Sequence, residues 1–202
     1  MKVSGDATLH APIDRVWAAL NDPAVLVRTI PGCERLEATG PDAYAMTVTA
    51  GVASIKGTYS GEVKLHDQQP PGSFVMSASG AGAPGTVSTE VQVRLSEVDG
   101  ATRLTYDADA VVGGMIGGVG QRMLAGVAKK TAGEFFAAVD DVLTGQAPAV
   151  AAATEPGQQG VYVAPAKPAR AMPEGFAAGA VVGAVIALAG VVVGGLLGRR
   201  RA

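Results

Sequence analysis

The chain has 202 residues, enough for one domain of ordinary size and some appended segments. With two histidines and a single cysteine, Cys33, it has no intramolecular disulfide and no sequence pattern of metal ligands. Residues 1–145 carry 11 Lys and Arg against 16 Asp and Glu, which argues against nucleic acid as a partner, because binding to phosphate needs clustered basic charge.

The first part of the chain predicts a strand followed by two short helices. Apolar and polar residues alternate over residues 3–9, as they do in a half-buried strand. Pro12 suits the first turn of a helix, and apolar residues follow it at helical spacing. Asp22 and Pro23 predict the N-cap and the first residue of a second helix, which ends at Pro31.

The next part of the chain predicts a run of strands that are apolar on one side. Turn signals such as Asp99-Gly100 separate them. A strand begins near Cys33, and the alternating segments after it are 44–50, 59–65, 74–78, 91–95 and 104–112. Strands with one apolar face predict a curved antiparallel sheet, which needs a cover on that face.

A long helix is expected to provide this cover. Between Met115 and Leu143, residues that recur every three or four positions predict one helical face, made of Ile116, Gly120, Met123, Val127, Thr131, Phe135, Ala138 and Val142. Residues 1–145 therefore predict an α+β domain of the helix-grip type, in which a curved antiparallel sheet wraps around a long C-terminal helix.

The remaining residues predict a linker and a membrane anchor. Residues 146–174 contain five prolines and little apolar periodicity, and as a random chain such a linker would span about 30 Å. Residues 176–198 have no charged or polar side chain and, as a helix, would be about 35 Å long, enough to cross a bilayer. We therefore expect residues 175–202 to form a single C-terminal transmembrane helix, whose membrane contacts include Phe176, Leu188, Leu196, Arg199, Arg200 and Arg201.

The N-terminal residues predict the side of the membrane on which the domain lies. They contain no apolar stretch typical of a secretory signal, so we expect the domain on the cytoplasmic face of the cell membrane. The arginines at 199–201 favour the opposite orientation under the positive-inside rule, but so short a tail is easily translocated. An anchor that lies in the plane of the membrane, with its arginines on anionic headgroups, is the alternative.

Sequence patterns for catalysis are absent. No serine lies in a G-x-S-x-G motif, and Asp107 and Asp109 fall on the polar side of their strand, where solvated carboxylates are expected. Residues 80–85 match G-x-G-x-x-G, but the match contains Pro84 and precedes a strand, whereas a dinucleotide site needs a helix there. Cys33 is expected to be a buried structural thiol. We therefore predict no catalytic residue, no metal, no covalent cofactor and no enzymatic activity.

Five glycines between residues 113 and 120 join the last of these strands to the long helix. A glycine in a helix costs about 1 kcal/mol relative to alanine, so this segment predicts either a connecting loop or a mobile gate beside a cavity. In the gate hypothesis Met115 and Ile116 form an apolar lip, and the residues that allow the motion are Gly113, Gly114, Gly117 and Gly118.

Small residues dominate the apolar strand faces, and only 4% of the residues are aromatic. Side chains of this size are expected to leave space beneath a covering helix, so the sequence predicts an open apolar cavity, the default ligand site in such a fold. The ligand contacts expected in it are Met46, Val48, Tyr59, Phe74, Met76, Tyr106, Met115, Ile116, Met123, Val127 and Phe135.

Several blocks of residues 1–145 resemble the G-subunit family of carbon monoxide dehydrogenase, within the START-like (SRPBCC) superfamily. They are Ile30-Pro31-Gly32-Cys33-Glu34, Ile55-Lys56-Gly57-Thr58-Tyr59, residues 67–72, Thr102-Arg103-Leu104-Thr105-Tyr106, Val112-Gly113-Gly114, Gly120-Gln121-Arg122, Ala128-Lys129-Lys130 and Phe135-Phe136. The resemblance implies a deep apolar cavity for a lipid, a sterol or a similar molecule. It also implies an accessory role to a molybdenum-containing carbon monoxide dehydrogenase at the respiratory membrane.

Three functions remain open on this basis. In the first, the tethered domain takes a prenylated quinone, with menaquinone as the expected one, out of membrane lipid and presents it to the dehydrogenase. In the second, the chain is a passive anchor that recruits the dehydrogenase, and side chains fill its cavity. In the third, it is a START-like enzyme, which would need more polar groups in the cavity than Tyr44, Tyr59 and Tyr106.

Overall fold

The computed structural model describes residues 1–147, 153–154 and 160–164. In chain order its elements are β1 (Lys2–Leu9), α1 (Ile13–Leu20), α2 (Pro23–Thr29), β2 (Cys33–Gly40), β3 (Ala43–Val52), β4 (Ile55–Gln69), β5 (Ser73–Gly82), β6 (Gly85–Val98), β7 (Ala101–Gly114), the 3-10 helix η1 (Met115–Val119), α3 (Gln121–Leu143), β8 (Ala153–Thr154) and β9 (Val161–Val163). The described strands form one antiparallel sheet in the order β1-β7-β6-β5-β4-β3-β2-β9-β8.

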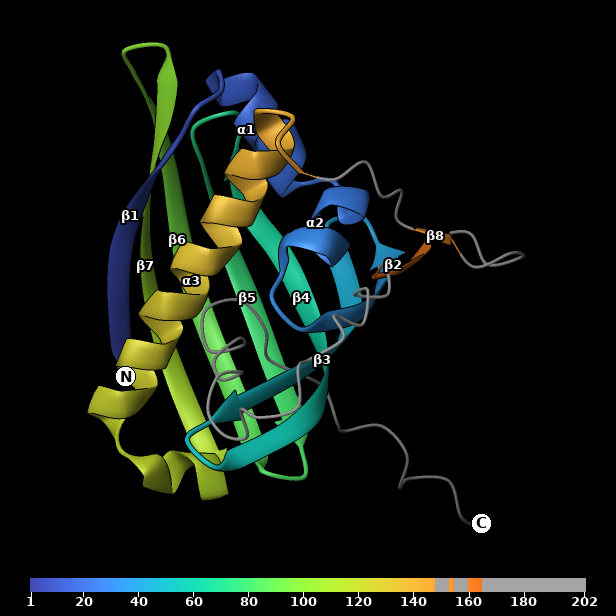
Figure 1. The fold of residues 1–202 in the computed structure, drawn as a ribbon, viewed down its shortest axis with the longest axis vertical. Coiled ribbons are helices and arrows are strands. Elements are labelled where there is room, and N and C mark those ends of the chain that lie inside the picture. Colours follow the sequence, from blue (N-terminus) through green and yellow to red (C-terminus); the bar gives the residue numbers. More distant parts are fainter. Residues whose placement is uncertain (148–152, 155–159, 165–202) are drawn as a thin grey trace, which may run out of the picture.

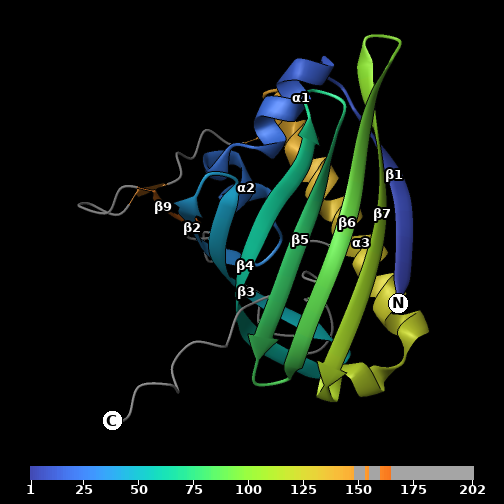
Figure 2. The ribbon, with the colours of Figure 1, turned by 180° about the vertical axis from the view of Figure 1, so that it is seen from behind.

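The sheet curves around three helices that lie on one of its faces (Figure 1). α3 runs along this face and contacts β1, and α2 contacts both α3 and β2. Seen from behind, the other face carries none of the described helices (Figure 2). Along β6, Val91, Val93 and Leu95 are buried and the residues between them are exposed, which makes the sheet apolar on the helix side only. This arrangement confirms the predicted α+β helix-grip fold.

The second short helix begins where the sequence signals predict, whereas Pro12, expected in the first turn of the first helix, is the N-cap of α1. The carboxylate of Asp22 accepts a hydrogen bond from the backbone N–H of Ala24 at 2.8 Å, so Asp22 is the N-cap of α2, and Pro23 is its first residue. The chain leaves α2 through Gly32, which has a φ of +77° and leads into β2. A left-handed φ of this kind favours glycine.

The apolar face of α3 differs from the predicted face by about one residue. Leu124, Ala128, Ala132, Val139 and Leu143 are buried, whereas the predicted positions Met123, Val127, Ala138 and Val142 are exposed or partly exposed. Phe135 and Thr131 are buried as predicted. The sequence of α3 is rich in Ala and Gly, which fit either face, so two overlapping stripes at helical spacing compete and the larger side chains decide between them.

The long helix also begins later than predicted. Residues Met115–Val119 form the 3-10 helix η1, and α3 starts at Gln121. Gly114 and Gly120 flank η1 with φ values of +76° and +97°. Such values end regular helix geometry, which is why one continuous helix does not form here.

Part of the predicted linker belongs to the sheet. Val161–Val163 form β9, which pairs with Arg35–Glu37 of β2, although the sequence pattern predicts no structure there. The predicted anchor, residues 175–202, lies outside the described residues. Among the residues that are described, no helix is both long and apolar enough to span a membrane.

Candidate functional site

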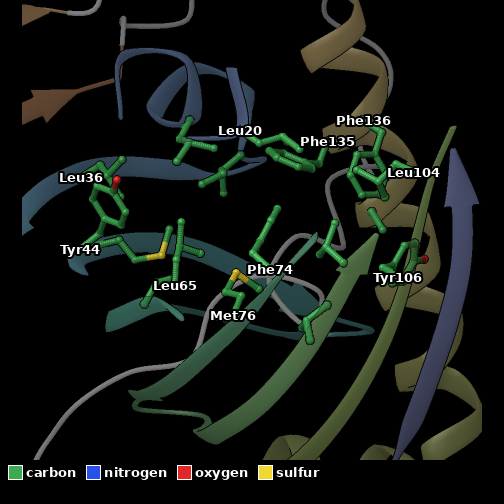
Figure 3. A pocket seen from close by; sticks show the side chains of 17 residues that line it. Leu20, Leu36, Tyr44, Leu65, Phe74, Met76, Leu104, Tyr106, Phe135 and Phe136 are labelled. Carbon is green, nitrogen blue, oxygen red and sulfur yellow. The ribbon is translucent and has the colours of Figure 1, made fainter. Parts of the chain in front are cut away.

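An apolar cavity of about 60 Å³ lies between the inner face of the sheet and the helices (Figure 3). α2 and β2 wall one side of the cavity, α3 walls another, and the strands from β3 to β7 form its base. The side chains that line it are Leu20, Leu26, Ile30, Leu36, Tyr44, Met46, Val63, Leu65, Phe74, Met76, Val91, Val93, Leu104, Tyr106, Ala132, Phe135 and Phe136.

Two phenols are the only hydroxyl groups among these lining side chains. The hydroxyl of Tyr44 donates a hydrogen bond to the backbone oxygen of Asn21 at 3.5 Å. Burial raises the pKa of Tyr44 and of Tyr106, and the nearby carboxylates of Asp42 and Asp6, respectively, raise it further. Both phenols are therefore neutral at physiological pH. The single O–H of Tyr44 already donates to the Asn21 oxygen, and the Tyr106 hydroxyl lies on the β1 side of its ring, against Gly5 (Figure 3).

The position of Tyr106 depends on a glycine in the neighbouring strand. Gly5 of β1 pairs with Tyr106 of β7, and a Cβ atom added at Gly5 would lie 2.6 Å from the Tyr106 hydroxyl oxygen. Alanine at this position would therefore displace the ring. Gly5 makes room for a phenol that lines the cavity.

Aromatic rings around the cavity pack in two groups, each of which joins a helix to the sheet. The ring centroid of Trp17 lies 5.6 Å from that of Phe74 in an edge-to-face arrangement. The ring of Phe136 lies 5.8 Å from Tyr106 and 5.1 Å from Phe135. Such pairs stabilise a core by about 0.5–1.5 kcal/mol beyond the burial of their surface. Trp17 is the only tryptophan of the chain, so its fluorescence reports on this cavity.

The structure brings together five of the eleven side chains that are expected from the sequence to contact a ligand. Met46, Phe74, Met76, Tyr106 and Phe135 all line the cavity. These five come from β3, β5, β7 and α3, so residues far apart in the chain meet in one place.

Six of the expected contacts lie elsewhere. Val48 is buried in the core but does not line the cavity. Tyr59 and Ile116 belong to a separate small apolar cluster that also contains Val87. The others are Met115 and Met123, which are 64% and 50% exposed, and Val127, which is only partly buried. The shifted face of α3 explains Met123 and Val127, and the 3-10 turn explains Met115.

The proposed gate is an ordered end of the sheet. Gly113 and Gly114 are the last residues of β7 and pair with Thr86 and Gly85 of β6. The backbone N–H of Ile116 donates to the Pro84 oxygen at 3.2 Å, and its side chain is 3% exposed. Neither the four gate glycines nor the lip residues line the cavity. This placement does not support a gate at the mouth of the cavity.

Sequence reasoning missed the wall made by α2 and β2. Leu26 and Ile30 of the α2 region and Leu36 of β2 line the cavity, as does Phe136 of α3. The apolar residues of α2 were visible in the sequence, but their position over the sheet depends on how the helix packs. A face of α3 centred on Phe136 as well as Phe135 would have identified that side chain.

The cavity is also smaller than predicted. Large side chains such as Leu65, Phe74 and Met76 converge on it, and Ala132 is its one small lining residue. Small-molecule sites usually enclose about 300–1,000 Å³, so about 60 Å³ does not hold a quinone ring unless side chains move. The apolar cavity that the sequence predicts is present, but large side chains fill most of the space beneath the helices.

Other reactive groups lie away from the cavity. Cys33 is buried, and burial raises the pKa of its thiol to about 12, as expected for a structural thiol. The exposed His10 contacts Asp140 at 2.7 Å, and His66 contacts Asp67 and Ser77 at 2.8 Å. In the described part of the chain, no three His, Cys, Asp or Glu side chains are placed to hold a metal ion.

A sequence model of the CoxG family, which is the G-subunit family of carbon monoxide dehydrogenase, matches residues 5–144. This range contains every residue that lines the cavity. A search of curated proteins found no match.

Solved structures share this architecture. A conserved protein from Geobacillus kaustophilus is 35% identical, with a TM-score of 0.69 over 72% of this chain and 97% of that chain. A START superfamily protein from Mycobacterium smegmatis is 14% identical, with a TM-score of 0.58 over 72% of this chain and 99% of that chain. The Zhui aromatase/cyclase from Streptomyces sp. R1128 is 19% identical, with a TM-score of 0.53 over 74% of this chain and 96% of that chain. The last two likenesses identify a START-like fold and nothing finer.

Proposed function

Because the chain belongs to the CoxG family of carbon monoxide dehydrogenase, we propose that it is an accessory protein that carries an apolar ligand for a molybdenum-containing carbon monoxide dehydrogenase. The proposed ligand is a prenylated quinone, with menaquinone as the specific candidate. In this proposal residues 175–202 hold the domain at the cytoplasmic face of the cell membrane, so that the domain can take the quinone from lipid and present it to the enzyme.

The apolar lining of the cavity is the observation that carries this proposal. Fifteen of the lining side chains are aliphatic, thioether or phenylalanine groups, and only Tyr44 and Tyr106 add hydroxyls. An isoprenoid tail gains about 25 cal/mol for each Å² that such a wall removes from water. The Tyr44 hydroxyl is bound to the Asn21 oxygen and the Tyr106 hydroxyl lies against Gly5, so a phenol would donate to a quinone carbonyl only after its ring or its bond is rearranged. The wall as it stands therefore suits the isoprenoid tail of a prenylated quinone.

A quinone ring can enter only if the wall moves. Met46 and Met76 line the cavity, and methionine side chains change rotamer easily to accommodate apolar groups. The wall also includes α2, which is only seven residues long and is held at its start by the Asp22 cap. We propose that binding displaces these side chains and α2, whereas the sheet and α3 keep their places.

The small volume of the cavity favours a second candidate function. A passive anchor that only recruits the dehydrogenase would have a cavity closed by side chains, and about 60 Å³ is close to that state. The two candidates differ in one measurable respect, because only the carrier binds a quinone.

The lining gives less support to catalysis. A START-like enzyme needs acid–base groups at the reacting atoms, whereas the lining side chains include no carboxylate, imidazole or amine. The raised pKa of Tyr44 and of Tyr106 also keeps each phenol protonated, so neither is available as a general base.

Mass spectrometry of the organic molecules that co-purify with the full chain tests the proposal. The carrier should retain a prenylated quinone when it is purified from its own membranes in mild detergent. If the folded chain retains none, and also shows no saturable binding when quinone is added, the passive anchor is the better account.

A further inference from the structure

The strand β9 attaches the segment after α3 to the edge of the sheet. Val161–Val163 pair antiparallel with Arg35–Glu37 of β2. Two further backbone hydrogen bonds extend the ladder: Ala38 N–H donates to the Gly160 oxygen at 2.8 Å, and Ala164 N–H donates to the Glu34 oxygen at 3.0 Å. The chain is therefore bound to β2 from residue 160 to residue 164.

Side chains of β9 also join the core. Val161 is 2% exposed, and Tyr162 and Ala164 pack against the main apolar cluster. β9 contacts α2 as well as β2, the two elements that wall one side of the cavity. Burial of the Val161 side chain stabilises this attachment beyond what backbone hydrogen bonds at an exposed sheet edge would contribute.

The attachment shortens the free tether. Between α3 and the anchor the sequence contains residues 146–174, but only residues 165–174 follow the last bond to β2. A random chain of about 10 residues spans about 17 Å on average and about 35 Å at full extension. A domain of about 150 residues has a radius of gyration of about 15 Å and is therefore nearly 40 Å across.

A tether of this length restricts how the domain can face the bilayer. A free linker of about 29 residues could span the whole domain and let any side face the membrane. A tether of ten residues, 165–174, that begins after Ala164 would keep the β2 side of the domain close to the lipid. That edge carries Leu36, and α2 beside it carries Leu26, both of which line the cavity.

We propose that β9 is an orienting strand, which docks the tether on β2 so that the α2–β2 wall of the cavity faces the membrane. This inference rests on the membrane anchor of the proposed function, but it does not depend on what the cavity binds. An apolar ligand would then have a short path between lipid and the wall that contains Leu26, Ile30 and Leu36.

Fluorescence quenching by lipid tests the orientation. The full chain is reconstituted in phosphatidylcholine and phosphatidylglycerol vesicles that contain a nitroxide headgroup lipid. One fluorophore is attached at Glu34→Cys, beside the exit of the tether, or at Met123→Cys on α3. Cys33 is buried and its pKa is raised, so it should stay unlabelled, and the parent chain serves as the blank. We expect stronger quenching at position 34, whereas stronger quenching at position 123 would overturn the proposal.

Two insertions of equal length give the matched control. About 10 Gly and Ser residues are added either between Ala164 and Pro165 or between Ala147 and Pro148. Only the first insertion lengthens the free tether if β9 is docked, so only it should cause a loss of quenching at position 34. Equal losses from both insertions would show that β9 does not hold the tether, which overturns the proposal. A chain that does not float with the vesicles would instead refute the anchor, and a failure to bind quinone would leave these readouts unchanged.

Discussion

Cys33 shows how a buried residue makes stability depend on pH. Its thiol has an ordinary pKa of 9.0, and burial raises this pKa to about 12 in the folded chain. Between these values the unfolded chain loses the proton while the folded chain keeps it, so the free energy of unfolding should fall as the pH rises above 9. The slope contributed by Cys33 is at most about 1.4 kcal/mol per pH unit.

Denaturation of the parent chain and of Cys33→Ala at several alkaline pH values checks this expectation. The raised pKa values of Tyr44, Tyr59 and Tyr106 act in the same direction in both proteins, so only the difference reports on the thiol. The variant should lose less stability above pH 9. Parallel curves would show that the thiol is not buried from solvent.

Thr131 offers a stabilising substitution on α3. Its hydroxyl is buried, and no hydrogen-bond partner for it lies among the described residues. Thr131→Val keeps the shape of the side chain and removes the unsatisfied group, so we expect a gain of about 1 kcal/mol in the free energy of unfolding. Thr144→Val is the control, because the exposed Thr144 hydroxyl already donates to the Asp140 oxygen at 2.8 Å. A melting temperature that rises equally in both variants would contradict this explanation.

At the scale of elements, two glycines in the turn between β7 and α3 differ in whether they can be replaced by alanine. Gly114 has a φ of +76°, and a Cβ there would lie 2.6 Å from the Cα of Gly85. Gly118 has open space around its Cβ position and no left-handed φ. Gly118→Ala should therefore be neutral or stabilise by about 0.4–1 kcal/mol, whereas Gly114→Ala should destabilise by more than that. Thermal melts that rank the two variants in the reverse order would disprove the geometry of this turn.

The same geometry limits which substitutions can be used to test the gate hypothesis. Gly117→Ala would place a Cβ 2.9 Å from the backbone oxygen of Val112, so this substitution would strain the turn as well as stiffen it. Ile116→Asp would bury a charge beside Tyr59 and Val87 and unfold the turn. Neither variant tests ligand entry cleanly, since each acts first on folding.

β9 makes a testable contribution to the stability of the domain. A chain that ends after Ala164 keeps β9, and a chain that ends after Gly145 lacks it and exposes the edge of β2. We expect the longer form to be more stable by about 1–3 kcal/mol, because it buries Val161 and retains the β9 ladder. Urea denaturation of both forms measures the difference. Equal midpoints would mean that β9 does not dock.

At the scale of the whole molecule, most of the fold follows from local signals. The alternation along β6 and the Asp22-Pro23 start of α2 act over a few residues, so they can be recognised without knowledge of the fold. β9 gave no such signal, because three residues are too few for periodicity and its partner, β2, is more than 100 residues away. The expected accessory role came from the family resemblance and not from the spacing of residues in the sequence.

The cavity was harder to predict than the sheet around it. Met46, Phe74 and Met76 could be placed because strand alternation determines which side chains face inward. Leu26 and Phe136 could not, because their positions depend on the packing angle of α2 and on the rotation of α3. The volume could not be predicted either, since it depends on how closely large side chains from several elements meet.

The most direct test of the account is a titration of the full chain in detergent with a short-chain menaquinone, followed by the fluorescence of Trp17. This residue packs against Phe74 of the cavity wall, so a bound naphthoquinone should quench it. Ala132→Leu fills the cavity from α3, and Ala137→Leu adds the same atoms to an exposed position of the same helix. Thermal melts of both variants verify that they are folded, because extra methylenes in a core cost about 1–3 kcal/mol.

The account predicts saturable quenching in the parent chain and in Ala137→Leu. In Ala132→Leu it predicts affinity that is at least about tenfold weaker, or about 1.4 kcal/mol. No saturable quenching in the folded parent chain, or equal affinity in both variants, would contradict a quinone site in this cavity.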